Sequence, residues 1–262
     1  MNAEVSSGMT GGAGASGPAV SPDTSLARQA EVARSAGDYL LAIEKLLELN
    51  RVAPDERIEK QLLDLRIEGF RQMHWPATEW RPDCDQRFTG DGALPEIDIA
   101  ELDAGAIRAG VLGSGALIVR GLMDPAAAAA TEENRHRALS ARMKLAAGEP
   151  QQRGERVFSR PGAVDGGPVQ FNSLGGEQYT DSGSVWAVDS PHNAFQLIEF
   201  YRQLGLAEIL REYFGEPAVL SVRKWVLRCM PPNNGAVSAW HQDGRFIGDD
   251  IRTVNLWIAL SD

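Results

Sequence analysis

The spacing of the apolar residues changes once along this 262-residue chain, and this change constrains the fold more than any other feature. Up to Gly215, apolar side chains recur mainly every three or four residues, which is the period of one face of an α-helix. After Pro217 the period becomes two, as on one face of a β-strand, and a Pro-Pro-Asn-Asn-Gly turn interrupts it. Helices followed by strands that are joined by turns predict an α+β architecture, with an antiparallel sheet or barrel, rather than a doubly wound fold.

Composition and periodicity divide the chain into four segments. Residues 1–25 are rich in Gly, Ser, Ala and Pro and have no periodic apolar face, so we expect a disordered leader. Residues 26–70 have a helical period that is broken at a Gly-Asp and a Pro-Asp pair, which predicts a hairpin of two or three antiparallel helices. Residues 71–95 are rich in turn formers and are interpreted as a linker, and residues 96–262 form the main domain.

The helical hairpin has one further feature in its sequence. Its segment 37–43 (Gly-Asp-Tyr-Leu-Leu-Ala-Ile), followed by Pro54, resembles one tetratricopeptide repeat. A solenoid needs about three repeats for stability, and no second copy occurs at that period. Two interpretations stay open: a hairpin that docks on the following domain, and an arm that binds a protein partner or mediates self-association.

Start and stop signals predict individual elements in the main domain. Asp124-Pro125 and Ser190-Pro191 each fit an N-cap followed by a proline in the first helical turn. The glycine-rich stretch between these two helices is expected to be a long loop. The predicted elements are strands at 96–100 and 116–120, helices through 107–111, from 124 to about 144 and from 190 to 215, a long strand at 220–230, and strands near 238–243 and 254–260.

The charge balance excludes several classes of partner. With 26 basic and 36 acidic side chains the net charge is −10, so a surface for nucleic acid or anionic lipid is not expected. No apolar run approaches the roughly 20 residues of a membrane span. The two cysteines, Cys84 and Cys229, cannot form a disulfide framework. We therefore expect a cytoplasmic protein.

The residues with the most chemical information form the run Trp240-His241-Gln242-Asp243-Gly244. On a strand, side chains two apart share a face, so His241 and Asp243 would lie side by side. One imidazole and one carboxylate, without a thiolate, suit Fe(II), Mn(II) or catalytic zinc, and a second histidine would complete the facial triad of non-haem iron oxygenases. By themselves, a histidine and a carboxylate at this spacing usually form just a hydrogen-bonded pair.

The order of the surrounding motifs resembles the phytanoyl-CoA dioxygenase family of Fe(II)/2-oxoglutarate-dependent oxygenases. The resemblance covers roughly residues 96–262. The matching segments are 115–122 (Gly-Ala-Leu-Ile-Val-Arg-Gly-Leu), the Asp124-Pro125 helix start, the strand 220–230 ending in Pro231-Pro232, the run 240–244, and 255–262 (Asn-Leu-Trp-Ile-Ala-Leu-Ser-Asp).

The resemblance implies a fold, a cofactor and site residues. The fold would be a double-stranded β-helix, a jelly-roll barrel with flanking helices. His241 and Asp243 would be two ligands of Fe(II), and Trp257 would line the pocket of the co-substrate 2-oxoglutarate. Asn255 points to the same side as Trp257 by the two-residue period and is assigned to the same pocket. The activity would be hydroxylation of a small organic substrate, with decarboxylation of 2-oxoglutarate to succinate.

The sequence departs from the family pattern after Asp243. The family has a second histidine ligand and an arginine for 2-oxoglutarate further along, whereas no histidine follows Asp243 here. The barrel is therefore expected to be incomplete at its C-terminus and the 262 residues to be inactive alone, as a fragment or as a natural truncation, with the fragment favoured because the chain stops within a sheet. The other histidines, His74, His136 and His192, are expected at the surface or at helix caps.

Two rival functions stay open. The first is a non-catalytic interaction protein, in which the repeat-like arm is attached to a degenerate or truncated barrel. The second keeps the metal but changes the reaction to hydrolysis by zinc-bound water.

Overall fold

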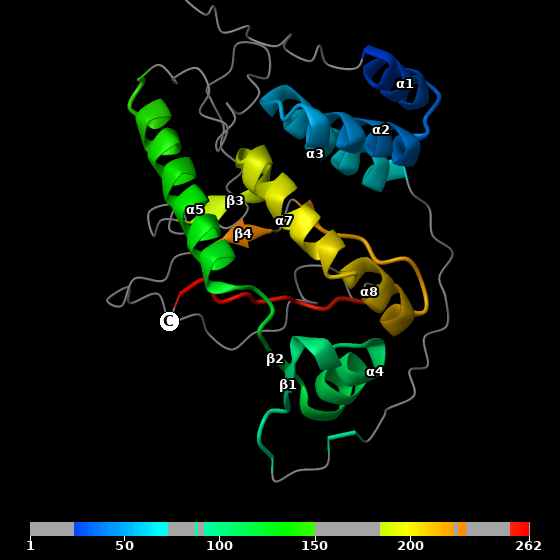
Figure 1. The fold of residues 1–262 in the computed structure, drawn as a ribbon, viewed down its shortest axis with the longest axis vertical. Coiled ribbons are helices and arrows are strands. Elements are labelled where there is room, and N and C mark those ends of the chain that lie inside the picture. The colour runs from blue at the N-terminus through cyan, green and yellow to red at the C-terminus, as the bar shows by residue number, and fades with distance from the viewer. Residues whose placement is uncertain are drawn as a thin grey trace, which may run out of the picture.

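The computed structural model describes residues 24–72, 87–88, 92–149, 184–222, 225–228 and 252–261. Helices make up 64% of these residues, and the strands are short. Figure 1 shows the N-terminal helices at one end, long crossing helices in the middle, and a small strand-helix-strand unit at the other end. The described part of the chain is therefore built from helices packed on helices.

The N-terminal helices have the bounds α1 (Thr24–Ser35), α2 (Tyr39–Val52) and α3 (Glu56–Gln72). Asp38 begins α2, because its side chain accepts a hydrogen bond of 3.0 Å from the backbone N–H of Leu41. The turn before α3 is held by Asn50, whose Oδ1 accepts from the backbone N–H of Asp55 at 2.8 Å. Both predicted breaks are confirmed, and we call α1–α3 the helical arm.

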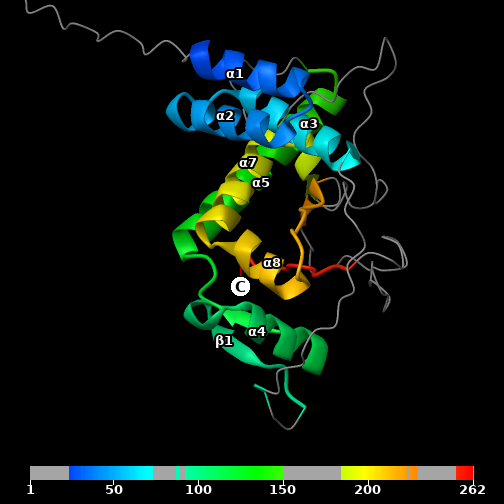
Figure 2. The same cartoon turned by 90° about the vertical axis from the view of Figure 1, so that its right-hand side faces the viewer.

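The helical arm packs on α7 (Pro191–Gln203), which belongs to the main domain (Figure 2). Phe195 of α7 contacts the core of the arm, and Leu63 of α3 lies in a second cluster with Ala194 of α7. These contacts agree with the interpretation that the hairpin docks on the following domain. Its use in binding a partner stays a prediction.

The first small sheet is parallel, whereas the sequence predicted antiparallel strands. Strand β1 (Glu96–Asp98) pairs with β2 (Ile118–Arg120), and Ile97 lies opposite Val119. The crossover between them holds α4 (Ala104–Ile107) and a π-helix at Arg108–Ser114, in place of one regular helix. The predicted strand at 96–100 ends early, because residues 99–101 form a 3-10 helix with a capping box at Asp98.

Gly110 permits close packing within this unit. A Cβ added to Gly110 would lie 2.7 Å from Cβ of Leu117, whereas a Cβ on Gly113 in the same π-helix would have nothing within 4 Å. We expect Gly110→Ala to lower the free energy of unfolding by about 1–3 kcal/mol, as overpacking does. Gly113→Ala should be neutral or slightly stabilising. Urea denaturation of the two variants tests this, and equal effects would contradict it.

The middle of the molecule contains α5 (Pro125–Ala146), α7 and α8 (Leu206–Phe214), with the second sheet of β3 (Val185–Trp186) and β4 (Val226–Leu227). The predicted start of α5 is confirmed, because Asp124 accepts hydrogen bonds from the backbone N–H groups of Ala126 and Ala127. The single helix predicted from Ser190 to Gly215 is two helices. Gly205 separates them with φ of +65°, a left-handed conformation that favours glycine.

The double-stranded β-helix is the prediction that the structure contradicts. The described residues form two two-stranded sheets, β1–β2 and β3–β4, and no barrel. Of the predicted long strand at 220–230, the described residues place only Val226 and Leu227 in a ladder. Alternating apolar residues predict a buried side, but a strand also needs hydrogen-bonding partners along its length, and here helices cover the buried side instead.

None of the described helices is both long and apolar enough to cross a membrane.

Candidate functional site

The two predicted iron ligands lie outside the described residues. His241 and Asp243 belong to the segment 229–251, of which the structure describes nothing. Their pairing on one face of a strand therefore stays a prediction.

The two residues assigned to the 2-oxoglutarate pocket lie in the extended segment 252–261. Val254 and Leu260 of this segment pack on the core, Val254 against the cluster that contains Tyr213 and Leu260 against the cluster that contains Leu227. Asn255 and Trp257 lie on the other side, and Trp257 is 77% exposed. The two residues are exposed on the same side, as the two-residue period predicts, and their assignment to the 2-oxoglutarate pocket stays a prediction.

The donor set of His241 and Asp243 fits iron in kind, because nitrogen and oxygen ligands without thiolate are typical of non-haem Fe(II) sites. It does not supply a complete set of protein ligands. In the ranges that the structure describes, no three side chains of His, Cys, Asp or Glu lie together so that they could hold a metal ion. The described ranges by themselves therefore contain no candidate metal cluster, and the third ligand of the proposed site is not identified.

The best-defined polar site of the described chain is the junction between the helical arm and α7. The side chains of His192, Phe195 and Glu199 recur at intervals of three and four residues, so they share one face of α7. His192 Nδ1 lies 3.0 Å from Oε1 of Glu59 on α3. The Glu59 side chain is 1% exposed and that of His192 16%, so this contact is almost removed from water.

The second polar contact of the junction is centred on Glu199. Arg51 of α2 donates to both of its carboxylate oxygens, at 2.8 and 3.0 Å, and Arg202 donates from Nε at 3.3 Å. Burial raises the pKa of Glu199, but the hydrogen bonds and positive charges of Arg51 and Arg202 outweigh the burial and hold the pKa below its usual value. Glu199 is therefore ionised at neutral pH and joins α2 to α7.

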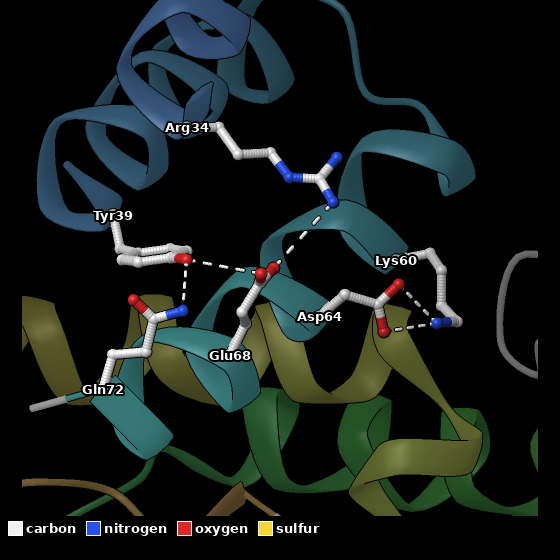
Figure 3. Close-up of polar contacts among 6 residues, drawn as sticks. All are labelled: Arg34, Tyr39, Lys60, Asp64, Glu68 and Gln72. Atoms are coloured by element: carbon white, nitrogen blue, oxygen red, sulfur yellow. Dashed lines mark hydrogen bonds and ion pairs between the residues drawn. The ribbon is translucent and has the colours of Figure 1, made fainter. Parts of the chain in front are cut away.

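A further polar cluster lies within the helical arm, as Figure 3 shows. The hydroxyl of Tyr39 donates to Glu68 at 3.3 Å and accepts from Gln72 at 2.7 Å, and Arg34 lies 3.8 Å from the other oxygen of Glu68. These residues come from all three arm helices. Because the contacts are at least partly exposed, they hold the helices together without forming an enclosed site.

A groove of about 530 Å³ lies between α4 and α8 at the other end of the molecule. Three carboxylates and one arginine line it, beside small and apolar residues: Asp103, Ala104, Glu208, Ile209, Arg211, Glu212 and Gly215. Asp103 is already engaged, since it accepts from the backbone N–H of Ala106 and pairs with Arg87. The groove is open and of mixed charge, and its residues form no catalytic arrangement.

The sequence interpretation placed His136 and His192 at the surface or at helix caps. His136 is exposed on α5, as predicted. His192 is instead largely buried against Glu59, so this prediction is wrong. The sequence did contain a signal, because Glu59 lies one helical turn before Leu62 and Leu63 on the apolar side of α3. A carboxylate on an apolar face calls for a buried partner.

Comparison with protein-family models, curated proteins and solved structures found no match to this chain. The resemblance to the phytanoyl-CoA dioxygenase family therefore rests on the sequence motifs alone.

Proposed function

We propose that this chain is part of an Fe(II)/2-oxoglutarate-dependent oxygenase that hydroxylates a small organic molecule. One observation carries the proposal: the run Trp240-His241-Gln242-Asp243-Gly244 lies between a proline-terminated apolar segment and the Asn-Leu-Trp-Ile segment at 255–258, in the order of the phytanoyl-CoA dioxygenase family. The proposal concerns the metal pair and its flanking motifs, and does not include a barrel.

His241 and Asp243 would hold the metal, and they account for two of the three protein ligands of a facial triad. Bound Fe(II) with 2-oxoglutarate and O₂ supplies the oxidation of a C–H group to C–OH, with release of succinate and CO₂. The imidazole of His241 must be neutral and the carboxylate of Asp243 ionised to bind a metal, so binding should weaken as the pH falls below about 6.

The activity test uses the protein at its natural length, supplied with Fe(II), 2-oxoglutarate and O₂, and measures succinate. We expect succinate release from the wild type and a loss of at least 100-fold in His241→Ala, because a ligand is removed. His136→Ala is the matched control, since His136 is an exposed histidine on α5 and should leave the rate unchanged. No succinate from the wild type, or equal rates in all three proteins, would overturn the assignment.

The second candidate is a non-catalytic interaction protein that uses the helical arm. The observation in its favour is that Val32 and Leu40 of the arm are 63% and 72% exposed, although the face of the arm toward α7 is covered. Two results together would support the interaction protein. The purified protein would contain no metal, and Leu40→Asp would abolish a self-association that light scattering detects in the wild type. Bound zinc without succinate release would instead support hydrolysis.

A further inference from the structure

The two polar contacts that join the helical arm to α7 each depend on a carboxylate. Glu199 of α7 accepts hydrogen bonds from Arg51 of α2 at 2.8 and 3.0 Å, and Oε1 of Glu59 on α3 lies 3.0 Å from Nδ1 of His192 on α7. The arm supplies one of the carboxylates and α7 the other. His192 and Glu199 are two helical turns apart, so the arm is held at two separate points along α7.

The charged groups around Glu199 come from three helices. Arg51 of α2 donates to both carboxylate oxygens, and Arg202, almost one turn further along α7, donates from Nε at 3.3 Å. The charge of Glu199 also acts on Arg66 of α3, and Glu48 of α2 acts on Arg51. The Glu199 side chain is only 13% exposed, so water and salt screen its interactions weakly.

We propose that the junction between the arm and α7 is an acid-sensitive switch, in which protonation of Glu199 loosens the helical arm from the main domain. A protonated carboxyl no longer attracts the guanidinium groups of Arg51 and Arg202, which then repel each other across the junction. The imidazole of His192 also becomes cationic in acid. Attraction between the arm and α7 is thereby replaced by repulsion between positive charges on both sides.

The pH range of the switch follows from the direction of the pKa shift of Glu199. Burial raises this pKa, but Arg51 and Arg202 outweigh the burial and hold it below its usual value while the arm is docked. In the open arm the side chain is exposed to water, and its pKa returns toward about 4.3. A carboxyl with a lower pKa in the docked state stabilises docking above the pKa of the open state, and this contribution is lost as the pH falls. Opening should therefore begin below about pH 5 and increase down to about pH 3.

The apolar contacts of the junction limit how far the arm opens. Phe195 of α7 packs on the core of the arm, and Leu63 of α3 lies in one cluster with Ala194 of α7. These contacts do not titrate, so acid raises the population of the open arm without removing the docked one. The open arm would expose the side of α7 that carries Phe195. This proposal does not depend on the metal pair or on the oxygenase activity.

The test is amide hydrogen exchange of the full chain, expressed as protection factors, which correct for the effect of pH on the intrinsic exchange rate. At pH 7, Glu199→Gln should lower the protection of α1–α3 at least tenfold and leave α5 and α8 unchanged. The wild type should show a loss of this size in α1–α3 between pH 7 and pH 3, and Glu199→Gln a clearly smaller one. Glu208→Gln, at an exposed position on α8, is the matched control and should behave as the wild type does.

A second variant tests the same contact without changing the carboxylate. Arg51→Gln leaves Glu199 paired with Arg202 on its own helix, and it should also lower the protection of α1–α3 at pH 7. The proposal is overturned if the wild type keeps its arm protection at pH 3, or if the wild type and Glu199→Gln lose protection equally between the two pH values. It is also overturned if α5 and α8 lose as much protection as the arm, because this would indicate general acid unfolding.

Discussion

Glu59→Ala is expected to lower the free energy of unfolding by about 3 kcal/mol, because it breaks a buried contact between a carboxylate and an imidazole. Glu59 is 1% exposed, and its Oε1 accepts from Nδ1 of His192 at 3.0 Å. Without the carboxylate, the largely buried imidazole loses this acceptor and a cavity remains between α3 and α7. Urea denaturation followed by circular dichroism measures the loss.

Two further variants isolate the contact from the loss of charge. Glu59→Gln keeps an oxygen that accepts from His192, so it should lose only about 1 kcal/mol. Glu31→Ala removes the same charge from an exposed position on α1 and should change stability by less than about 0.5 kcal/mol. In a double-mutant cycle Glu59→Ala and His192→Ala should be clearly non-additive. Additive effects would show that the two side chains do not interact.

Leu62→Ala is expected to lower the free energy of unfolding by about 2–5 kcal/mol, the range for truncating a buried leucine. Leu62 is 1% exposed in the core of the helical arm, where Leu46 of α2 and Phe195 of α7 also pack. The cavity would therefore weaken both the arm and its contact with the main domain. Leu40→Ala, at a position that is 72% exposed, makes the same chemical change and should cost less than about 0.5 kcal/mol.

The place in the fold where Leu62→Ala lowers stability shows whether the helical arm unfolds together with the main domain or by itself. If the arm is part of the common core, Leu62→Ala should also raise hydrogen exchange at the amides of α7. Unchanged exchange in α7, together with a loss of protection confined to α1–α3, would mean that the arm unfolds by itself and that its contacts with α7 contribute little.

The starts of α2, α3, α5 and α7 could be predicted because their signals are local. Asp124 followed by Pro125 starts α5, and Pro191 lies at the first position of α7. The break between α2 and α3 follows from Pro54 in the same way. Each of these signals acts through hydrogen bonds or steric limits within a few residues, so the rest of the fold does not change the outcome.

The strands could not be predicted as reliably, because a strand depends on a partner that is distant in sequence. Residues 252–261 show the expected two-sided pattern, with Val254 and Leu260 packed on the core and Trp257 exposed. Packing of one side of this segment against helices accounts for the alternation, without pairing to a neighbouring strand. The parallel pairing of β1 with β2 is likewise set by the crossover between them, which local periodicity does not encode.

The junction between the arm and α7 brings together residues that are about 130 to 150 positions apart, as in Glu59 with His192 and Arg51 with Glu199. No spacing rule connects such pairs. The sequence could show only that Glu59 lies on an apolar face of α3. The proposed metal pair is the opposite case, because His241 and Asp243 are two residues apart and their placement on one strand face is a prediction from spacing alone.

The most direct test of the account is whether His241 and Asp243 bind a divalent metal. Mn(II) is a suitable probe, because it accepts the same nitrogen and oxygen ligands as Fe(II). Calorimetric titration of the protein at its natural length should show one bound Mn(II) for the wild type and for His136→Ala, and a dissociation constant at least tenfold higher for His241→Ala and for Asp243→Ala. Equal binding by all four proteins, or none by the wild type, would contradict the central claim.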